Sequence, residues 1–173
     1  MFGAVVSGRP PQVDGVDEMV GLFANTVPVR VRFDSDAPVR QLLIRLQSEQ
    51  VSLLDCHHIG LADIQRSAGA GELFDTLVAF ESYPIDTDGL RQAHATIDGL
   101  EVVDLQGRTF THYPVAVVVE LGTRLHVQVQ YRRDMITTAT AQALAARLRV
   151  LIGEFVATPE RTPAEINRFC DDR

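Results

Sequence analysis

Two adjacent histidines, His57 and His58, are the residues of this sequence with the most obvious capacity for chemistry. Imidazoles bind zinc and transfer protons, but neighbouring side chains on a helix point about 100° apart. A zinc site usually spaces its helical ligands by three or four residues, and Asp63 is not placed to complete a catalytic pair. The pair is better explained as a polar helix end near the negative pole of the helix dipole. No metal site is predicted.

Three other positions carry groups of chemical interest. Ser7-Gly8-Arg9 lacks the flanking glycine spacing of a serine-hydrolase elbow. Arg30 and Arg32 could clamp a phosphate, or they could form the solvated face of a strand or pair with some of the many acids. His112 opens a predicted buried strand, where it would face a pocket or make a structural hydrogen bond. No catalytic acid–base pair or nucleophile triad is visible, so catalytic residues are predicted to be none.

Composition restricts the class of protein. The 173 residues suit one domain or one lobe of a larger one, and the apolar share of 46% is ordinary for a globular protein. A net charge of −7 argues against nucleic acid as a partner. No apolar run approaches the roughly 18 residues that a membrane span needs, and no signal peptide is visible. Cys56 and Cys170 are expected to be free thiols, so a cytoplasmic location is predicted.

The segment from Val20 to Phe33 organises the chain. Its second half alternates apolar and polar residues, which predicts a strand from Val27 to Phe33 with one buried face. Asn25 and Thr26 lie just before that strand among apolar neighbours. They either satisfy backbone groups at a bend or face a cavity, and the sequence leaves both alternatives open.

The remaining pattern predicts an α/β fold of the α+β two-layer type. It has a mixed sheet of about five strands with long helices packed on it. A first long helix, capped by Asp36, is expected to lie across the sheet, and Thr137 or Thr138 is expected to cap the last one. The other predicted elements are strands at Phe2–Val6, Thr76–Phe80, Thr96–Leu105, Tyr113–Leu121 and Leu125–Tyr131, a helix at Leu61–Ser67, a loop at Glu81–Ala95 and a surface tail at Glu160–Arg173.

The segment V-G-L-F-A-N-T-V-P-V-R, from Val20 to Arg30, resembles a segment of nonribosomal peptide synthetase condensation domains that reads approximately (V/I)-G-x-F-x-N-T-x-x-x-R. The match places Gly21, Phe23, Asn25, Thr26 and Arg30 on the fixed positions of that segment. Four further segments resemble the same family in the same order: Val5–Pro11, Leu53–Gln65, Glu72–Pro84 and His112–Val115.

The resemblance implies a particular architecture. The family has two lobes like chloramphenicol acetyltransferase, arranged around a tunnel that the phosphopantetheine arms of carrier proteins enter. Its catalytic His-His-x-x-x-Asp-Gly motif belongs to the N-terminal lobe, and this chain resembles the C-terminal lobe. His57-His58 is not that motif, because Ala62 and Asp63 stand where its Asp and Gly would be. Residues 1–166 are therefore expected to form the lobe and residues 167–173 a charged tail.

The resemblance also implies site residues. Ser7, Asn25, Thr26 and His112 are expected to line the tunnel or contact pantetheine, although Asn25 and Thr26 would alternatively brace a bend. Gly21, Phe23 and Arg30 are expected to be structural. The loop from Glu81 to Ala95 would reach toward the other lobe.

The implied function is one half of a domain that forms amide bonds between carrier-bound thioesters. Such a fragment, without the catalytic histidine, is expected to be inactive alone. Its partners would be the N-terminal lobe, peptidyl carrier proteins and a second copy bound through the orphaned interlobe face. No cofactor would bind directly, and the 4′-phosphopantetheine arms would be substrates of the complete domain. The alternatives are a stand-alone binding or dimerisation module, or the same lobe of an epimerisation or heterocyclisation domain.

Overall fold

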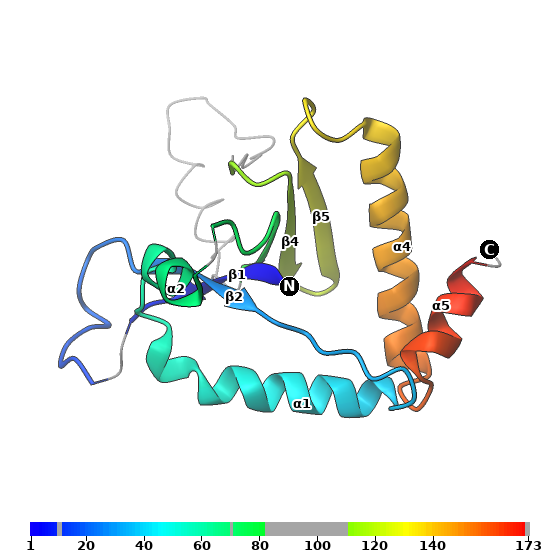
Figure 1. The fold of residues 1–173 in the computed structure, drawn as a ribbon, viewed down its shortest axis with the longest axis horizontal. Coiled ribbons are helices and arrows are strands. Elements are labelled where there is room, and N and C mark those ends of the chain that lie inside the picture. The colour runs from blue at the N-terminus through cyan, green and yellow to red at the C-terminus, as the bar shows by residue number, and fades with distance from the viewer. Residues whose placement is uncertain (10–11, 70, 82–110, 172–173) are drawn as a thin grey trace, which may run out of the picture.

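The computed structural model describes residues 1–9, 12–69, 71–81 and 111–171 (Figure 1). The predicted strand at 96–105 and nearly all of the predicted loop at 81–95 lie outside these residues. The described elements are, in chain order, β1 (Phe2–Ser7), β2 (Ala24–Val29), α1 (Val39–Ser52), the 3-10 turn η1 (Leu54–Cys56), α2 (Leu61–Ala68), β3 (Thr76–Glu81), β4 (Val115–Leu121), β5 (Leu125–Tyr131), α4 (Thr138–Ala157) and α5 (Pro163–Asp171).

The strands form one mixed sheet in the order β2-β1-β3-β4-β5. The two outer pairs, β2 with β1 and β4 with β5, are antiparallel, whereas β1, β3 and β4 run parallel to one another. The α/β prediction with a mixed sheet of about five strands is therefore confirmed. Among the described helices, none is long and apolar enough to span a membrane.

The β4–β5 hairpin forms as its sequence predicts. β4 is a nearly continuous apolar run, and Val115, Ala116 and Val118 are buried. β5 alternates apolar residues with His126, Gln128 and Gln130. This pattern is typical of a strand with one solvent-exposed face. Gly122 N donates to Arg124 O at 3.2 Å in the tight connection between them.

β2 begins and ends earlier than its alternation predicts. The strand runs from Ala24 to Val29, so Asn25 and Thr26 are inside it rather than at a bend before it. Val29 is only 3% exposed, but Phe33 is 71% exposed. The pairing of β2 with β1 ends at Val29, which lies opposite Phe2, so the residues after Val29 are outside the described ladder.

Helix α1 begins without the side-chain cap that Asp36 was expected to supply. The N-cap position is Pro38, and Asp36 N donates instead to Asp34 Oδ1 at 3.1 Å. The first free N–H groups of the helix find backbone acceptors in the α4–α5 connection: Val39 N donates to Arg161 O at 2.9 Å, and Arg40 N to Pro159 O at 2.8 Å. These bonds satisfy donors that every helix start leaves open.

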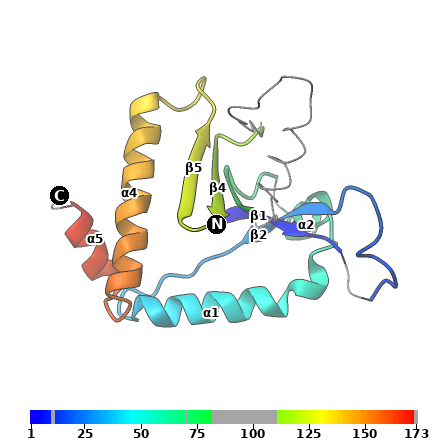
Figure 2. The same ribbon diagram turned by 180° about the vertical axis from the view of Figure 1, so that it is seen from behind.

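The same bonds fix where α1 lies. Figures 1 and 2 show the helix below β4 and β5, with its first turn beside the α4–α5 connection, so the expectation that it lies across a sheet face is wrong. Val39 and Leu42 are buried, whereas the apolar Ile44 remains 57% exposed.

Helix α4 lies beside β5 in both views and starts at the predicted cap (Figures 1 and 2). Thr137 is the N-cap, and its Oγ1 accepts from Thr140 N at 3.2 Å. Tyr131 Oη donates to Thr138 Oγ1 at 2.9 Å and joins the end of β5 to the first turn of the helix.

We expect Thr137→Ala to lower the free energy of unfolding by about 1 kcal/mol, because it removes the acceptor of a free helix N–H. In a chain of this size that change lowers Tm by about 2–4 °C. Thr137→Ser keeps the oxygen and serves as the control, with unfolding followed by circular dichroism. Equal loss in both variants would show that the methyl group matters and the cap does not.

The C-terminal segment is a helix rather than a trailing tail. Thr162 and Glu165 form a reciprocal capping box, with Thr162 N donating to Glu165 Oε2 at 2.9 Å and Glu165 N to Thr162 Oγ1 at 3.3 Å. Ile166 is 1% exposed and is among the most buried side chains of the described residues. Helix α5 therefore continues through the expected boundary between a lobe at 1–166 and a tail at 167–173.

Candidate functional site

Three of the segments that resemble the condensation family meet in space at the start of β2. The end of β1 pairs with it, and the loop between η1 and α2 lies against it. In both views α2 is beside β1 and β2 (Figures 1 and 2). We call this meeting point of the β1 end, the β2 start and the loop at 57–60 the strand–loop junction.

Just beyond the paired residues of β1 and β2, the backbones of Gly8 and Phe23 lie close together. Gly8 N donates to Phe23 O at 2.6 Å. A Cβ atom at Gly8 would lie 2.9 Å from the same carbonyl oxygen. A side chain at this position would therefore push the two strand ends apart, which explains why the turn after β1 carries glycine.

Asn25 ties the loop to the sheet with every polar atom of its side chain. Its Nδ2 donates to His57 O at 2.8 Å and to Ile59 O at 2.7 Å. Its Oδ1 accepts from Thr26 N at 2.9 Å. These bonds occupy both amide hydrogens, so the arrangement is that of a brace. A contact between Asn25 and pantetheine stays a prediction.

Ser7 and Thr26 lie on the opposite face of the sheet from Asn25. Ser7 pairs with Ala24 and Val5 with Thr26, while Asn25 pairs with Val6. Because side chains alternate along a strand, Ser7 and Thr26 share one face and Asn25 occupies the other. Neither hydroxyl of this pair has a hydrogen-bond partner among the described residues.

Arg9 is a residue that the sequence did not single out by itself. Its guanidinium donates to Val16 O and, at 3.0 Å, to Met19 O. It also lies 4.0 Å from the centroid of the Phe23 ring. Arg9 therefore holds the turns at 12–18 against the start of β2. Its place in the Val5–Pro11 segment, just after the turn glycine, was the available signal.

Gly21 and Phe23 take part in the same packing. A Cβ at Gly21 would lie 3.1 Å from Phe23 Cε2, so the ring covers the glycine. Arg30, the last residue of the resembling segment, follows β2 and is exposed.

Backbone hydrogen bonds hold the first of the two histidines. His57 O accepts from Asn25, and His57 N donates to Leu54 O at 3.1 Å. His57 Nε2 is buried without a hydrogen-bond partner, whereas His58 is exposed. The described residues include no group of three or more His, Cys, Asp or Glu side chains that could hold a metal. Asp63 pairs with Arg66 at 2.7 Å.

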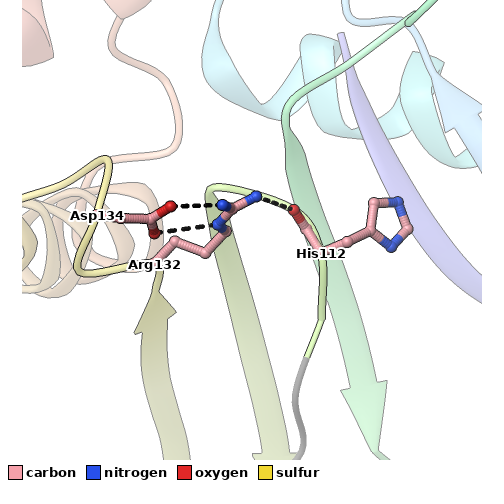
Figure 3. Close-up of polar contacts among 3 residues, drawn as sticks. All are labelled: His112, Arg132 and Asp134. Atoms are coloured by element: carbon pink, nitrogen blue, oxygen red, sulfur yellow. Dashed lines mark hydrogen bonds and ion pairs between the residues drawn. The ribbon is translucent and has the colours of Figure 1, made fainter.

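His112 is not brought to the junction. It precedes the first residue of β4, whereas Ser7 is the last residue of β1, and these strands run in the same direction through β3. The two residues therefore lie at opposite ends of the sheet. Figure 3 shows that the backbone of His112, and not its ring, faces Arg132, whose Nη1 donates to His112 O at 3.4 Å.

The ring of His112 is part of an aromatic cluster with Tyr113 and Phe74. The His112 and Tyr113 rings have centroids 4.1 Å apart, and Tyr113 lies 5.3 Å from Phe74. Partial burial, followed by the negative charge of Glu72, raises the pKa of the Tyr113 hydroxyl above its ordinary value of 10.0. Tyr113 is therefore a neutral stacking partner and not a base at physiological pH.

The carboxyl pKa of Asp134 reports on its ion pair with Arg132, which lies at this end of the sheet. A hydrogen bond from the Arg132 guanidinium, with Nε 3.2 Å from Oδ1, holds the pKa of the carboxyl below its ordinary value of 3.8. The pair therefore adds stability above the pKa of the unfolded chain and loses it as the pH falls through the folded pKa.

We expect Arg132→Gln to raise the pKa of Asp134 toward 3.8, because the substitution removes the charged donor. Carboxyl chemical shifts of Asp134 followed by NMR against pH measure this change. Arg133→Gln removes a neighbouring charge without touching the pair and should leave the titration almost unchanged. An identical Asp134 pKa in the Arg132 variant would contradict the assigned cause.

Comparison with known proteins adds a decisive observation to this geometry: the model of the family described as "Condensation domain" matches residues 1–172. The chain belongs to the condensation domain family. Among curated members, vanchrobactin synthetase VabF of Vibrio anguillarum is 34% identical over 165 residues, which are 95% of this chain and 6% of that protein. Surfactin synthase subunit 3 of Bacillus subtilis (strain 168) is 30% identical over 172 residues, which are 99% of this chain and 13% of that protein. The chain thus spans a small part of these relatives.

Two solved structures share the fold. The structure titled "holo T3CT" superposes with a TM-score of 0.70 at 24% identity and covers 94% of this chain and 38% of that chain. The four-domain nonribosomal peptide synthetase AB3403 superposes with a TM-score of 0.74 at 17% identity and covers 95% of this chain and 14% of that one. At these identities the likeness establishes the fold alone. The same fold is therefore present in both of these solved structures.

Proposed function

We propose that this chain is the C-terminal, chloramphenicol-acetyltransferase-like lobe of a condensation domain in a secondary-metabolite peptide synthetase. The observation that carries the proposal is a family match over residues 1–172 in a sequence without the His-His-x-x-x-Asp-Gly motif. This chain covers 38% of the structure titled "holo T3CT", so a similar fold occurs there as part of a larger chain.

In the complete domain, an acceptor amine attacks the carbonyl carbon of a carrier-bound acyl thioester. The new C–N bond forms, the C–S bond breaks, the donor thiol leaves, and the amine loses a proton. The histidine of the other lobe positions or deprotonates that amine. This lobe supplies wall and positioning groups rather than the base.

Specific residues have distinct parts in this proposal. The Ser7 and Thr26 hydroxyls lie on one sheet face and have no hydrogen-bond partner among the described residues, which supports their contact with a pantetheine arm. Asn25 supports the wall indirectly by bracing the loop at 57–59. The chain holds no cofactor of its own, and the 4′-phosphopantetheine arms are substrates. Peptidyl carrier proteins and the N-terminal lobe are its partners, in the cytoplasm.

The test uses the isolated chain with two loaded carrier proteins and detects amide product by mass spectrometry. We expect no product above a reaction without the chain. Adding a separately expressed lobe that contains His-His-x-x-x-Asp-Gly should restore product, and the same lobe with its second histidine changed to alanine should not. Product formed by the isolated chain would show that catalysis does not require the missing lobe.

An alternative is a stand-alone binding or dimerisation module. It is favoured by Val20 and Leu22, which flank Gly21 and are 103% and 95% exposed, since exposed apolar side chains promote association. Sedimentation velocity of the wild type and of a Val20→Ser, Leu22→Ser double variant distinguishes the dimerisation module from the condensation-domain lobe. A dimer that dissociates in the variant supports the module, and a monomer in both opposes it. The same lobe of an epimerisation or heterocyclisation domain would instead be identified by the product of the restored enzyme.

A further inference from the structure

Strand β2 is an outer strand of the sheet, because β1 is its only partner among the described strands. An outer strand carries one row of backbone groups that no neighbouring strand binds. Such a row is a template for a strand from another molecule, and proteins commonly cover it or block it. The groups on the outer edge of β2 therefore decide whether the sheet can grow there.

The β1–β2 register identifies the residues that face this edge. Gly8 N donates to Phe23 O at 2.6 Å, which makes these two residues a hydrogen-bonded pair of the antiparallel arrangement. Hydrogen-bonded pairs alternate with pairs whose backbone groups point away from the partner strand. In β2 the residues of this second kind are Ala24, Thr26 and Pro28, which lie opposite Ser7, Val5 and Gly3. Their backbone groups therefore face outward.

Two of these three outward residues offer no N–H group to a further strand. Pro28 has none, because its ring nitrogen carries no hydrogen. Thr26 N donates to Asn25 Oδ1 at 2.9 Å, so a side chain already occupies it. A ladder needs both an N–H and a C=O from every second residue. The edge thus presents carbonyl acceptors, but Ala24 is its one outward residue with an N–H that is not blocked in these ways.

Asn25 connects this edge to the neighbouring loop. Its Nδ2 donates to His57 O at 2.8 Å and to Ile59 O at 2.7 Å. Helix α2, which follows that loop, also lies beside β2 (Figure 1). The side chain that occupies the Thr26 N–H is therefore held in place by two further hydrogen bonds, so the block is a fixed part of the fold.

We propose that Asn25 and Pro28 close the outer edge of β2 to strand addition, and that the strand they exclude is β2 of a second copy of this chain. Antiparallel pairing of two β2 strands is self-complementary, as a two-fold dimer requires. With Thr26 opposite Thr26 of the second copy, Ala24 lies opposite residue 28. Each of these pairs would exchange two hydrogen bonds if residues 26 and 28 both had a free N–H. The proposal concerns the sheet and is independent of the proposed reaction.

The experiment opens the edge and measures self-association relative to the wild type by sedimentation velocity over a concentration series. Pro28→Val supplies the missing N–H, and Asn25→Ala frees that of Thr26. We expect the double variant to shift to a species of about twice the mass of the chain, because β2 has one outer edge to pair. Pro28→Val alone restores fewer bonds and should give a smaller, concentration-dependent shift, which tests the proposal even if the double variant does not fold.

Amide exchange followed by NMR examines the blocked group itself. The Thr26 N–H should be protected in the wild type although it faces the outer edge, because Asn25 accepts its hydrogen bond. It should lose this protection in Asn25→Ala and regain it in the associated double variant. Rapid exchange of this amide in the wild type would contradict the block.

Two controls separate edge pairing from association through partial unfolding. Thr26→Pro, added to the double variant, removes the freed N–H at an outward position where an edge strand tolerates proline, and it should restore wild-type sedimentation. Ile166→Ala lowers stability by emptying a buried site in α5 and leaves both blocks in place, so it should sediment like the wild type. Unchanged sedimentation of both Pro28→Val variants, association that persists with Thr26→Pro, or equal association of Ile166→Ala would each overturn the proposal.

Discussion

Asn25→Ala should lower the free energy of unfolding by about 2–3 kcal/mol, because it removes three hydrogen bonds and leaves two loop carbonyls and one strand N–H without their partner. In a chain of this size that loss corresponds to a fall in Tm of about 5–10 °C. Chemical denaturation followed by circular dichroism measures the change.

The choice of substitution sharpens this test. Asn25→Asp keeps the shape of the side chain but directs a carboxylate at the carbonyl oxygens of His57 and Ile59. It should therefore be at least as destabilising as alanine at neutral pH. Thr26→Val is the matched control, since the Thr26 hydroxyl has no partner among the described residues. If Asn25 only lined a tunnel, both Asn25 variants would unfold like the wild type.

Gly3→Ala should cost about 2 kcal/mol, because the new methyl group would overlap the Phe74 ring. A Cβ at Gly3 would lie 2.5 Å from Phe74 Cζ and closer still to Cε2. The ring is itself stacked on Tyr113 at 5.3 Å, so moving it disturbs a second aromatic contact. Urea denaturation of the single variant measures the cost.

A double-variant cycle identifies the cause. Phe74→Leu shortens the side chain, so Gly3→Ala should cost less in that background, with a coupling of about 1 kcal/mol. Gly71→Ala is the control, since no non-neighbouring atom of the described residues lies within 4 Å of a Cβ built there. Additive effects of Gly3→Ala and Phe74→Leu would rule out the clash as the cause.

Local signals predicted much of the fold. The alternation of β5 and the apolar run of β4 predicted the hairpin, and the cap of α4 was narrowed to Thr137 or Thr138, because each depends on residues close in sequence. The end of β2 was missed because it depends on pairing with β1: alternation continues to Phe33, but the last paired residue of β2 is Val29, opposite Phe2. Charged composition suggested a tail after Glu160, although Thr162 and Glu165 have the spacing of a capping box.

The candidate site was predicted only in part. The sequence could select Asn25 but could not choose between a brace and a cavity wall, because its acceptors, His57 O and Ile59 O, are 32 and 34 residues away. It grouped Ser7, Asn25 and Thr26 although strand register places Asn25 on the other face. His112 was joined to them by resemblance alone, and parallel strand direction places it at the opposite end of the sheet.

The short ladder between β1 and β3 has a consequence for how the chain folds. Only Gly3↔Leu77 and Ala4↔Val78 join the β2–β1 pair to the β3–β4–β5 group among the described strands. β2, α1 and α2 all lie between β1 and β3 in the chain. Pairing β1 with β3 therefore has the entropy cost of closing a long loop and forms few hydrogen bonds in return. Because non-local pairing forms slowly, we expect the joining of the two strand groups to be slower than the pairing within either group. The Phe74 ring packs on Gly3, so the pairing of β1 with β3 also forms this contact, which stabilises the β1–β3 junction.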